Sequence, residues 1–299
     1  MYFRKVLLLK KLRQITVVGM GLLGGSVGRA VLRCFSGVKV VGYTHRASTR
    51  RKARELGVAT EVVGNLGQSV SEADMVVLAT PICTFEAYFA EIAGSLRSGC
   101  IVTDIGSTKV LPGRWAAKKL PSRVHYVGSH PIAGSEQRGV EFARDDLFED
   151  AMCVLTTTEK TNRFAVRTLR SFWCELGCIV TTMKPAEHDR IFANVSHLPH
   201  ITAAALINAN KSDEMKMAGK GFLDTSRVAS GPVNIWADIL LTNSGNVIKG
   251  IDRLTGELSK LRTAVESRDR MRIESLLKNA RDKRGELMKY KMKRKELIP

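Results

Sequence analysis

Three short segments of the chain combine side chains that can exchange protons and bind anions. They carry hydroxyl, imidazole and carboxylate groups in close spacing, and they read DIGSTK from Asp104, GSHPIAGSE from Gly128 and HDRIFANVSHLPH from His188. An unperturbed imidazole has a pKa of about 6.5, so it can accept and return a proton near neutral pH. The first two segments follow predicted strands, and ligands of open α/β sheets bind at the carboxyl ends of strands. Ser107 and His130 are therefore expected beside a bound cofactor.

A fourth segment, GMGLLGGS beginning at Gly19, lies between an apolar run and a helical pattern. It matches GxGxxG, in which Gly19 permits a tight turn, Gly21 lets a pyrophosphate approach and Gly24 lets the helix lie close to the strand. Free N–H groups at the start of the helix then face the phosphates. A glycine-rich turn also occurs in α/β proteins without a ligand, but this position favours a dinucleotide site. The expected contacts are Gly19, Gly21, Leu22, Leu23 and Gly24.

The end of the second predicted strand bears on which dinucleotide binds. An acidic residue there would accept hydrogen bonds from the ribose diol and would repel a 2′-phosphate. The chain instead has Thr44, His45 and Arg46, followed by Arg50, Arg51 and Lys52. A hydroxyl and several cations suit a 2′-phosphate, although the cations can equally form the exposed face of the next helix. The pattern predicts NADP or NAD, with NADP favoured, and cofactor contacts from Thr44, His45, Arg46 and Thr80.

Short β-branched runs alternate with longer amphipathic stretches from residue 14 to about residue 183, a rhythm that predicts βαβ units. Most of the runs are continuously apolar, as expected when helices cover both faces of a parallel sheet. The predicted strands are residues 15–18, 38–42, 75–79, 101–104, 125–128, 152–156 and 178–182. We therefore expect an α/β, Rossmann-like doubly wound sheet.

The character of the chain changes after Lys184 and Pro185, where strand patterns stop and apolar residues recur at helical spacing. We expect a dinucleotide-binding domain over residues 1–183 and an all-α C-terminal domain over residues 184–299. Near the end, an apolar seam repeats at steps of three and four residues, and it consists of Ile251, Leu254, Leu258, Leu261 and Val265. Such a seam packs against its own chain or against a second copy, so both readings stand, and a homodimer through the helical domain is expected.

Composition excludes several classes of protein. With 44% hydrophobic and 25% charged residues, the chain is neither disordered nor collagen-like. Its apolar runs are far shorter than the roughly 20 residues that a membrane span requires. The start of the chain lacks the pattern of a signal peptide, so we expect a cytoplasmic protein. The six cysteines form no CxxC pair, which predicts reduced core residues and no metal site.

The net charge of +18 is concentrated in three places. Residues 1–13 carry +5, residues 44–54 carry +5 and residues 251–299 carry +7. Charge at the ends of a chain is usually solvated surface, so nucleic-acid binding is the weaker interpretation.

In their order along the chain, these segments resemble the prephenate/arogenate dehydrogenases of tyrosine biosynthesis. The resemblance rests on GMGLLGGS, DIGSTK, SHPIAGSE, HDRIFANVSHLPH and GFLDTSRVASGPVNIWADI, and it runs from about Ile15 to the helix after Asn246. The glycine loop is common to many dehydrogenases, whereas SHPIAGSE together with SHLPH is specific. The resemblance implies NAD(P)-dependent oxidative decarboxylation, in which hydride leaves C4 of a cyclohexadienol and the ring carboxylate leaves as carbon dioxide. The substrate is then prephenate or arogenate.

The resemblance also assigns the catalytic residues. His130 would be the base at the C4 hydroxyl, and Ser107 would share that hydrogen bond. Arg227 would anchor a substrate carboxylate, although a salt bridge to Asp224 is its structural alternative.

The remaining substrate contacts also follow from the resemblance. His197 and Glu136 match substrate-side positions of the family. Trp236 would line the far wall, although a buried tryptophan is more often a core residue. Pro199 should kink the helix beside His197, because proline cannot donate the helical hydrogen bond. His200, one turn further along, fits a core histidine better than a ligand contact.

Two other functions are compatible with parts of the sequence. A β-hydroxyacid dehydrogenase joins the same two kinds of domain, but its usual lysine has no matching motif around Lys216 or Lys220. A dinucleotide-sensing regulator that binds nucleic acid would use the basic tail, where Tyr290 is the only aromatic residue for stacking.

Overall fold

The computed structural model describes residues 12–133 and 137–293. The strands are β1 (Gln14–Val18), β2 (Lys39–Tyr43), β3 (Glu61–Val63), β4 (Met75–Leu78), β5 (Ile101–Asp104), β6 (His125–Tyr126), β7 (Gly128–Pro131), β8 (Met152–Thr156) and β9 (Ile179–Met183). The helices of the first half are α2 (Leu22–Cys34), α3 (Ala47–Glu55), α4 (Leu66–Val70), α5 (Phe85–Ile92), α6 (Val110–Lys119) and α7 (Arg163–Glu175). The later helices are α8 (Pro185–Phe192), α9 (Leu198–Asn208), α10 (Ser212–Met215), α11 (Lys220–Ser226), α12 (Val233–Thr242), α13 (Ser244–Glu266) and α14 (Arg270–Lys293).

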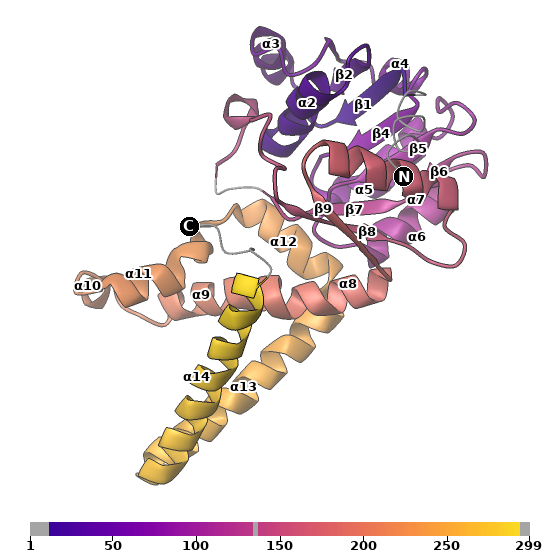
Figure 1. The fold of residues 1–299 in the computed structure, drawn as a ribbon. Coiled ribbons are helices and arrows are strands. Elements are labelled where there is room, and N and C mark those ends of the chain that lie inside the picture. The colour runs from indigo at the N-terminus through magenta and orange to yellow at the C-terminus, as the bar shows by residue number, and fades with distance from the viewer. Residues whose placement is uncertain (1–11, 134–136, 294–299) are drawn as a thin grey trace. The chain divides into compact units, whose positions relative to one another are not determined.

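Six strands form one parallel sheet in the order β3-β2-β1-β4-β5-β6 (Figure 1). The order runs outward in both directions from β1 and β4, which confirms the predicted doubly wound arrangement. Loops that leave the carboxyl ends of β1 and β4 diverge to opposite sides of the sheet, and this opens a crevice for a ligand. The glycine loop follows β1 and Thr80 follows β4, so both lie at that crevice.

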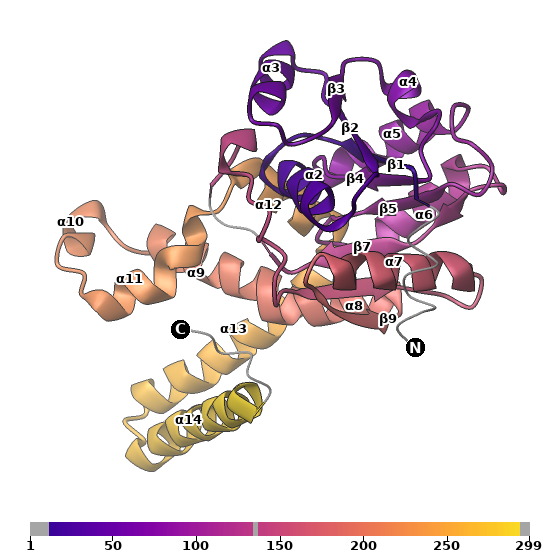
Figure 2. The ribbon, with the colours of Figure 1, turned by 45° about the horizontal axis from the view of Figure 1, so that its top comes forward.

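Alternating side chains of the central strands fill two separate cores. Ile15 and Val17 of β1 belong to the core under α2 and α7, whereas Val18 belongs to the core under α4 and α5. Met75 of β4 faces the first core and Val76 faces the second. Figure 2 shows α2 lying across the sheet in front of β1. Because both faces are covered, the strands read as uninterrupted apolar runs, as the sequence indicated.

A second sheet, which the sequence did not predict, has the order β7-β8-β9. The predicted strand over residues 125–128 is in fact divided between β6 and β7, which belong to different sheets. His130 lies within β7 and opposes Val154 of β8 in an antiparallel register. The GSHP segment has no apolar alternation, because its strand form depends on pairing with β8 rather than on local propensity. The short edge strand β3 was also missed.

From residue 184 onward, the described part of the chain contains helices and no strand, as expected. Helix α8 starts with Pro185 in its first turn, where proline loses no helical hydrogen bond. Between α8 and α9, residues Ala193–His197 adopt a π-helical turn just before Pro199. The helical hydrogen-bond pattern is thus irregular beside His197, where proline lacks an N–H group to donate.

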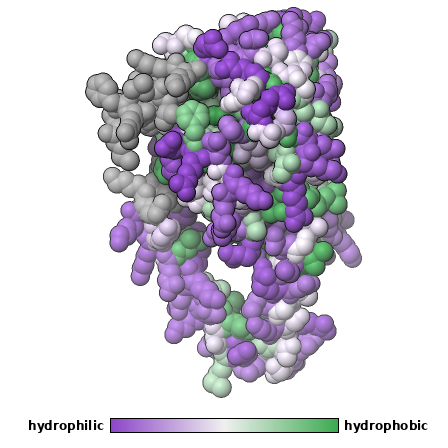
Figure 3. All heavy atoms as spheres, turned by 90° about the vertical axis from the view of Figure 1, so that its right-hand side faces the viewer, coloured by the Kyte–Doolittle hydropathy of each residue, from purple (hydrophilic) through white to green (hydrophobic). Residues whose placement is uncertain are grey.

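The chain divides into two compact units, one ending at Asn246 and the other beginning at Val247. The second unit contains most of α13 and all of α14, and α14 has no buried residue. Of the apolar seam, Leu254 and Leu261 are half-buried, whereas Leu258 remains 56% exposed. None of the described helices is both long enough and apolar enough to cross a membrane. Hydrophilic side chains dominate the face drawn in Figure 3, with apolar side chains scattered among them.

Candidate active site

The glycine loop between β1 and α2 has no space for side chains. Gly19 has φ +102°, and a Cβ built there would lie 2.7 Å from the carbonyl oxygen of Ala79. A Cβ on Gly24 would lie 1.9 Å from the carbonyl oxygen of Gly19, so the helix can approach the strand only because residue 24 is glycine. Both positions behave as the motif predicts.

The start of α2 is open to an anion. Gly21 caps the helix without a side-chain hydrogen bond, and a Cβ built on it would meet nothing within 4 Å. No acidic residue lies in the first turn, so the N–H groups of Leu22 and Leu23 and the helix dipole face the crevice uncompensated. Thr80 lies against Gly19. These residues fit a dinucleotide pyrophosphate.

The cations after β2 are mostly engaged with protein groups. Arg50 donates from Nη1 to the carbonyl oxygens of Thr44 and His45, at 2.9 and 2.8 Å. Lys52 pairs with Glu141 at 3.2 Å, and Arg51 lies 3.9 Å from Glu55. Arg46 is exposed, and its guanidinium makes no hydrogen bond or ion pair with any residue that the structure describes. Arg46 is thus the cation that remains available at the end of β2, beside the buried Thr44.

His130 is the first member of a chain of three hydrogen-bonded side chains. Its Nδ1 lies 2.8 Å from Nε2 of His188, and Nδ1 of His188 lies 2.8 Å from Oδ1 of Asp189. Phe192 packs against both imidazoles, with ring centroids 4.9 Å from His130 and 4.4 Å from His188. The three polar groups therefore meet in apolar surroundings, where a hydrogen bond is stronger than in water.

The chain of hydrogen bonds fixes which nitrogen carries each proton. A carboxylate accepts hydrogen bonds, so Asp189 holds the proton of His188 on Nδ1. Neutral His188 then presents a lone pair on Nε2, and His130 must donate to it from Nδ1. The remaining ring nitrogen of His130, Nε2, consequently carries a lone pair and can accept a proton from another molecule.

Asp189 is itself held at the amino terminus of a helix. Oδ1 accepts a hydrogen bond from the N–H group of Lys109 at 2.8 Å, and Oδ2 accepts one from Val110 at 2.9 Å. These are the first N–H groups of α6, which has no cap from its own side chains. A carboxylate at a helix amino terminus is stabilised by the helix dipole and by charge-assisted hydrogen bonds.

A buried ion pair between Lys109 and Asp104 lies next to the segment that carries His130. The fully buried Lys109 donates to Oδ1 of Asp104 and to the carbonyl oxygen of Ser129, the latter at 2.7 Å. Tyr126 donates to Oδ2 of the same carboxylate at 2.6 Å. Because Ser129 immediately precedes His130, this network anchors the backbone that carries the imidazole.

The surroundings favour neutral histidines. Burial lowers the pKa of His130 well below its ordinary value of 6.5, and His188, Lys109 and His197 lower it further. Burial also lowers the pKa of His188, although the hydrogen bond to Asp189 opposes that shift. For His197, burial lowers the pKa to about 4. Neutral imidazoles are what the tautomers of the hydrogen-bonded chain require.

His197 and Trp236 come together in the helical part of the first unit. The two rings meet edge-on with centroids 6.3 Å apart, and His200 stacks flat on Trp236 at 3.6 Å. Gly231 makes this stack possible, because a Cβ there would lie 2.3 Å from Nε1 of Trp236. His197 is 1% exposed, and its Nε2 has no hydrogen-bond partner among the described residues.

The other predicted residues are placed less tightly. Ser107 lies between β5 and α6, and its hydroxyl makes no hydrogen bond to any residue in the described ranges. Arg227 is exposed at the end of α11. Glu136 lies outside the described residues. The structure thus joins His130 to His188 and Asp189, and His197 to Trp236.

Sequence reasoning assigned no role to Lys109, His188, Asp189 or Asn243. His188 and Asp189 stand in a polar segment, HDRIFANVSHLPH, and that polarity was the available signal. Lys109 ends the DIGSTK segment, but nothing local indicates that its side chain turns inward. Asn243 has no sequence signal, because the two site residues that its side chain contacts, Asp189 and His197, are at least 46 residues away.

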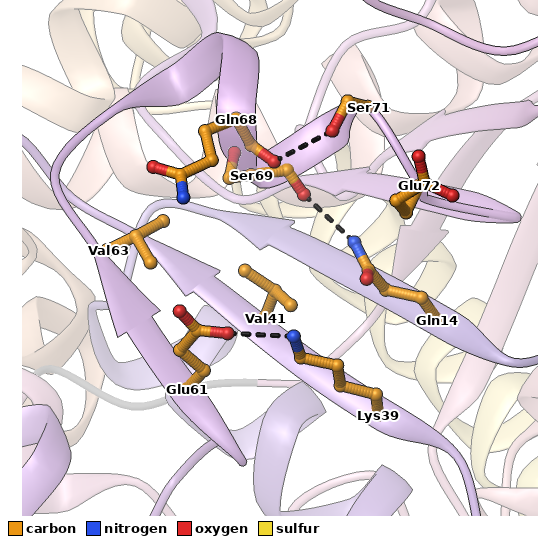
Figure 4. A pocket seen from close by; sticks show the side chains of 9 residues that line it. All are labelled: Gln14, Lys39, Val41, Glu61, Val63, Gln68, Ser69, Ser71 and Glu72. Carbon is orange, nitrogen blue, oxygen red and sulfur yellow. Dashed lines mark hydrogen bonds and ion pairs between the residues drawn. The ribbon is translucent and has the colours of Figure 1, made fainter.

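A cavity of about 190 Å³ lies at the opposite end of the strands (Figure 4). Its lining includes Gln14, Lys39 and Glu61, the first residues of β1, β2 and β3. Two polar contacts lie in this lining: Lys39 pairs with Glu61 at 2.8 Å, and Gln14 donates to the carbonyl oxygen of Ser69 at 3.1 Å. None of the predicted site residues lines this cavity.

Comparisons with known proteins agree with the geometry. The family model for the prephenate dehydrogenase nucleotide-binding domain matches residues 27–182, and that for the prephenate dehydrogenase dimerization domain matches residues 184–279. The prephenate dehydrogenase of Bacillus subtilis is 34% identical over 280 residues, which cover 91% of this chain and 76% of that protein.

Solved structures extend the match to three dimensions. A crystal structure of prephenate dehydrogenase from A. aeolicus, in complex with hydroxyphenyl propionate and NAD+, has a TM-score of 0.86 at 31% identity and covers 92% of this chain and 98% of that chain. The arogenate dehydrogenase of Synechocystis has a TM-score of 0.78 at 30% identity and covers 92% of this chain and 99% of that chain.

The β-hydroxyacid alternative retains a likeness in fold alone. The 3-hydroxyisobutyrate dehydrogenase of Salmonella typhimurium has a TM-score of 0.54 at 14% identity, and it covers 85% of this chain and 95% of that chain. With both family domains matched and a relative at 34% identity over most of its length, the chain belongs to the prephenate dehydrogenase family and is an oxidoreductase of that family.

Proposed function

We propose that this enzyme oxidises and decarboxylates prephenate or arogenate, with His130 as the base that takes the proton of the ring hydroxyl. The observation that carries the proposal is the hydrogen-bonded chain from Asp189 through His188 to His130. That chain leaves Nε2 of His130 as an acceptor, which is the form that a general base needs. Asp189 and His188 act through His130, so they are positioning residues.

The chemistry of the substrate explains why one base is enough. A bound nicotinamide dinucleotide supplies the hydride acceptor. As His130 takes the proton of the ring hydroxyl, the hydride on the carbon that bears this hydroxyl would pass to that acceptor, and the carbon would become a carbonyl. Loss of the ring carboxylate as carbon dioxide would then leave its electron pair in the ring, which becomes aromatic, and the resulting phenolate oxygen would take a proton back. Ser107 is proposed to hold the same hydroxyl in line with His130. The Ser107 hydroxyl makes no hydrogen bond within the described residues, so it is available for the substrate, which supports that role.

Prephenate carries two carboxylates and arogenate carries two carboxylates and an ammonium group, so the pocket needs cations and hydrogen-bond donors. Arg227 is proposed to anchor a carboxylate, since a hydrogen bond to a charged group contributes about 1.5–3 kcal/mol. His197 and Trp236 are proposed to line the substrate pocket, and Glu136 is proposed to lie near the substrate side chain. Residues 184–299 would then form a domain for substrate binding and dimerisation, beside a dinucleotide-binding domain over residues 1–183.

The relative in the A. aeolicus structure binds NAD+, and we infer that the cofactor here is a nicotinamide dinucleotide held by the loop from Gly19 to Gly24. For the ribose, we infer a preference for the 2′-phosphate of NADP. No acidic residue directly follows β2, and the guanidinium of Arg46 has no partner within the described part of the chain. Thr44 and His45 complete the proposed contact.

A homodimer is proposed through the second compact unit. A unit of two helices buries little apolar surface by itself, and here Leu258 is 56% exposed and Val265 is 61% exposed. Contiguous exposed apolar side chains of this kind mark interaction sites. The match of residues 184–279 to a dimerization domain supports a second copy as the partner.

The base can be tested by substitution. His130→Asn should lower kcat by about 100-fold or more while leaving the Kd of the cofactor unchanged, because general-base catalysis contributes roughly that factor. Arg227→Ala is the matched contrast, and it should raise the KM for prephenate with a much smaller change in kcat. Steady-state kinetics and cofactor titration measure both, and an unchanged kcat in His130→Asn would remove this residue from the reaction.

The pH profile tests the state of the same imidazole. Because the pKa of His130 is lowered, the neutral base persists as the pH falls through 6.5, and protonation removes it only at lower pH. We expect kcat/KM, which reports on the free enzyme, to hold its plateau at pH 6.5 and to decline below it. The rate of substrate loss without enzyme is subtracted at each pH. An acid limb centred at or above 6.5 contradicts the assignment.

Cofactor and substrate choice are tested together by initial rates with prephenate or arogenate and with NAD or NADP. We expect higher kcat/KM with NADP, and Arg46→Asp should reverse that ratio by roughly 10-fold or more through loss of a charged hydrogen bond. Arg51→Asp is the control, because Arg51 lies beside Glu55 and should leave the ratio unchanged. A strong NAD preference of the unaltered enzyme would defeat the inference, and inactivity with both substrates would defeat the proposed function.

The dimer is tested by sedimentation. The unaltered chain should sediment at about twice its mass of 32.9 kDa, and Leu258→Asp should shift it towards the single-chain mass, because a buried unpaired carboxylate is costly in an apolar interface. Ser259→Asp places the same charge on the adjacent exposed residue and should leave the dimer intact. A dimer that survives Leu258→Asp would move the interface away from this seam.

A further inference from the structure

Asn243 is a buried amide to which neither the motifs nor the proposed reaction assigns a role. It lies at the end of α12 with 5% exposure. Its Nδ2 donates to the carbonyl oxygen of Asp189 at 2.7 Å and also lies 3.3 Å from Nδ1 of His197. Its Oδ1 accepts a hydrogen bond from Nδ2 of Asn246 at 2.8 Å. All polar atoms of this side chain are therefore engaged.

The orientation of the Asn243 amide follows from its partners. A backbone carbonyl oxygen can only accept, so the atom that faces Asp189 must be the amide nitrogen. The same nitrogen faces His197, and it has two hydrogens, one for each partner. Because an amide N–H group donates, Nδ1 of His197 must offer a lone pair. Neutral His197 then carries its proton on Nε2.

The Nε2–H group of His197 is buried, and it lacks a hydrogen-bond acceptor among the described residues. An unsatisfied buried donor is costly, so this group calls for an acceptor, and a bound ligand can supply one. The titratable groups that interact with His197 are Asp189, His188 and His130, and burial lowers the pKa of His197 to about 4. The imidazole is thus a neutral donor at physiological pH.

We propose that Asn243 is a positioning residue that fixes His197 in its Nε2–H tautomer, so that His197 donates a hydrogen bond to a carboxylate or keto oxygen of the substrate. The substrate contact rests on the proposed function. Asp189 thereby determines both a hydrogen-bond acceptor and a hydrogen-bond donor in the same site. Its carboxylate, through His188, makes Nε2 of His130 an acceptor, and its backbone carbonyl, through Asn243, makes Nε2 of His197 a donor.

The tautomer is measured directly by ¹⁵N NMR of the full chain labelled at histidine. The signal of His197, identified by its loss in His197→Gln, should show a protonated Nε2 and an unprotonated Nδ1 in the unaltered protein. Asn243→Asp replaces the donor with an acceptor and should reverse this pattern. Asn246→Ala is the control, because Asn246 touches the oxygen of Asn243 and not His197, and the pattern should persist. A protonated Nδ1 in the unaltered protein overturns the proposal, whatever the enzyme does to prephenate.

The contact with substrate is measured by ligand titration and kinetics. Hydroxyphenyl propionate, which does not react, should shift the Nε2–H resonance of His197, and an unmoved resonance at saturation overturns the donor role. Asn243→Ala should raise the KM for substrate by roughly 10-fold with a smaller change in kcat, whereas His197→Gln, which keeps an amide donor, should retain most of the affinity. Equal losses of kcat and cofactor binding in Asn243→Ala would indicate a merely structural residue. These readouts remain available if Asn243→Asp does not fold.

Discussion

The Asp189 carboxylate at the amino terminus of α6 is the constraint on which the site depends. It accepts hydrogen bonds from the first N–H groups of that helix, and it orients His188 and therefore His130. Its backbone carbonyl holds Asn243 at the end of α12. Removing the carboxylate would leave helical N–H groups unpaired and would free both imidazoles to exchange tautomers. The Asp189 side chain thus both caps a helix and orients the histidines of the site.

The parallel sheet supplies the frame around that carboxylate. Strands whose side chains alternate between two cores can be covered on both faces, and ligands of such sheets bind at the carboxyl ends of the strands. The glycine loop lies at that edge, where the backbone of the helix approaches the backbone of the loop closely. A Cβ on Gly24 would overlap the carbonyl of Gly19. Beneath the neighbouring strands, the buried Lys109 ties β5 to the backbone before His130. The cofactor loop and the base are therefore held by separate, rigid contacts.

Several predictions from the sequence hold because their causes are local. The doubly wound sheet follows from apolar runs separated by helical patterns, and the helical turn before Pro199 is irregular because proline lacks an N–H group. The strand β7 was missed for the opposite reason. His130 and its neighbours have no strand-like alternation, and they become a strand only by pairing with β8, more than 20 residues further along the chain.

What the sequence determined by itself is the set of chemical groups and the order of elements that carry them, because backbone sterics and apolar periodicity act over a few residues. Only the tertiary structure decided which nitrogen of each histidine holds a proton. That choice depends on hydrogen bonds between residues far apart in the chain, 58 positions for His130 and His188 and 80 for Lys109 and Asp189. The tautomer of a histidine is set by its hydrogen-bond partner, and the residues next to the histidine in the sequence do not identify that partner.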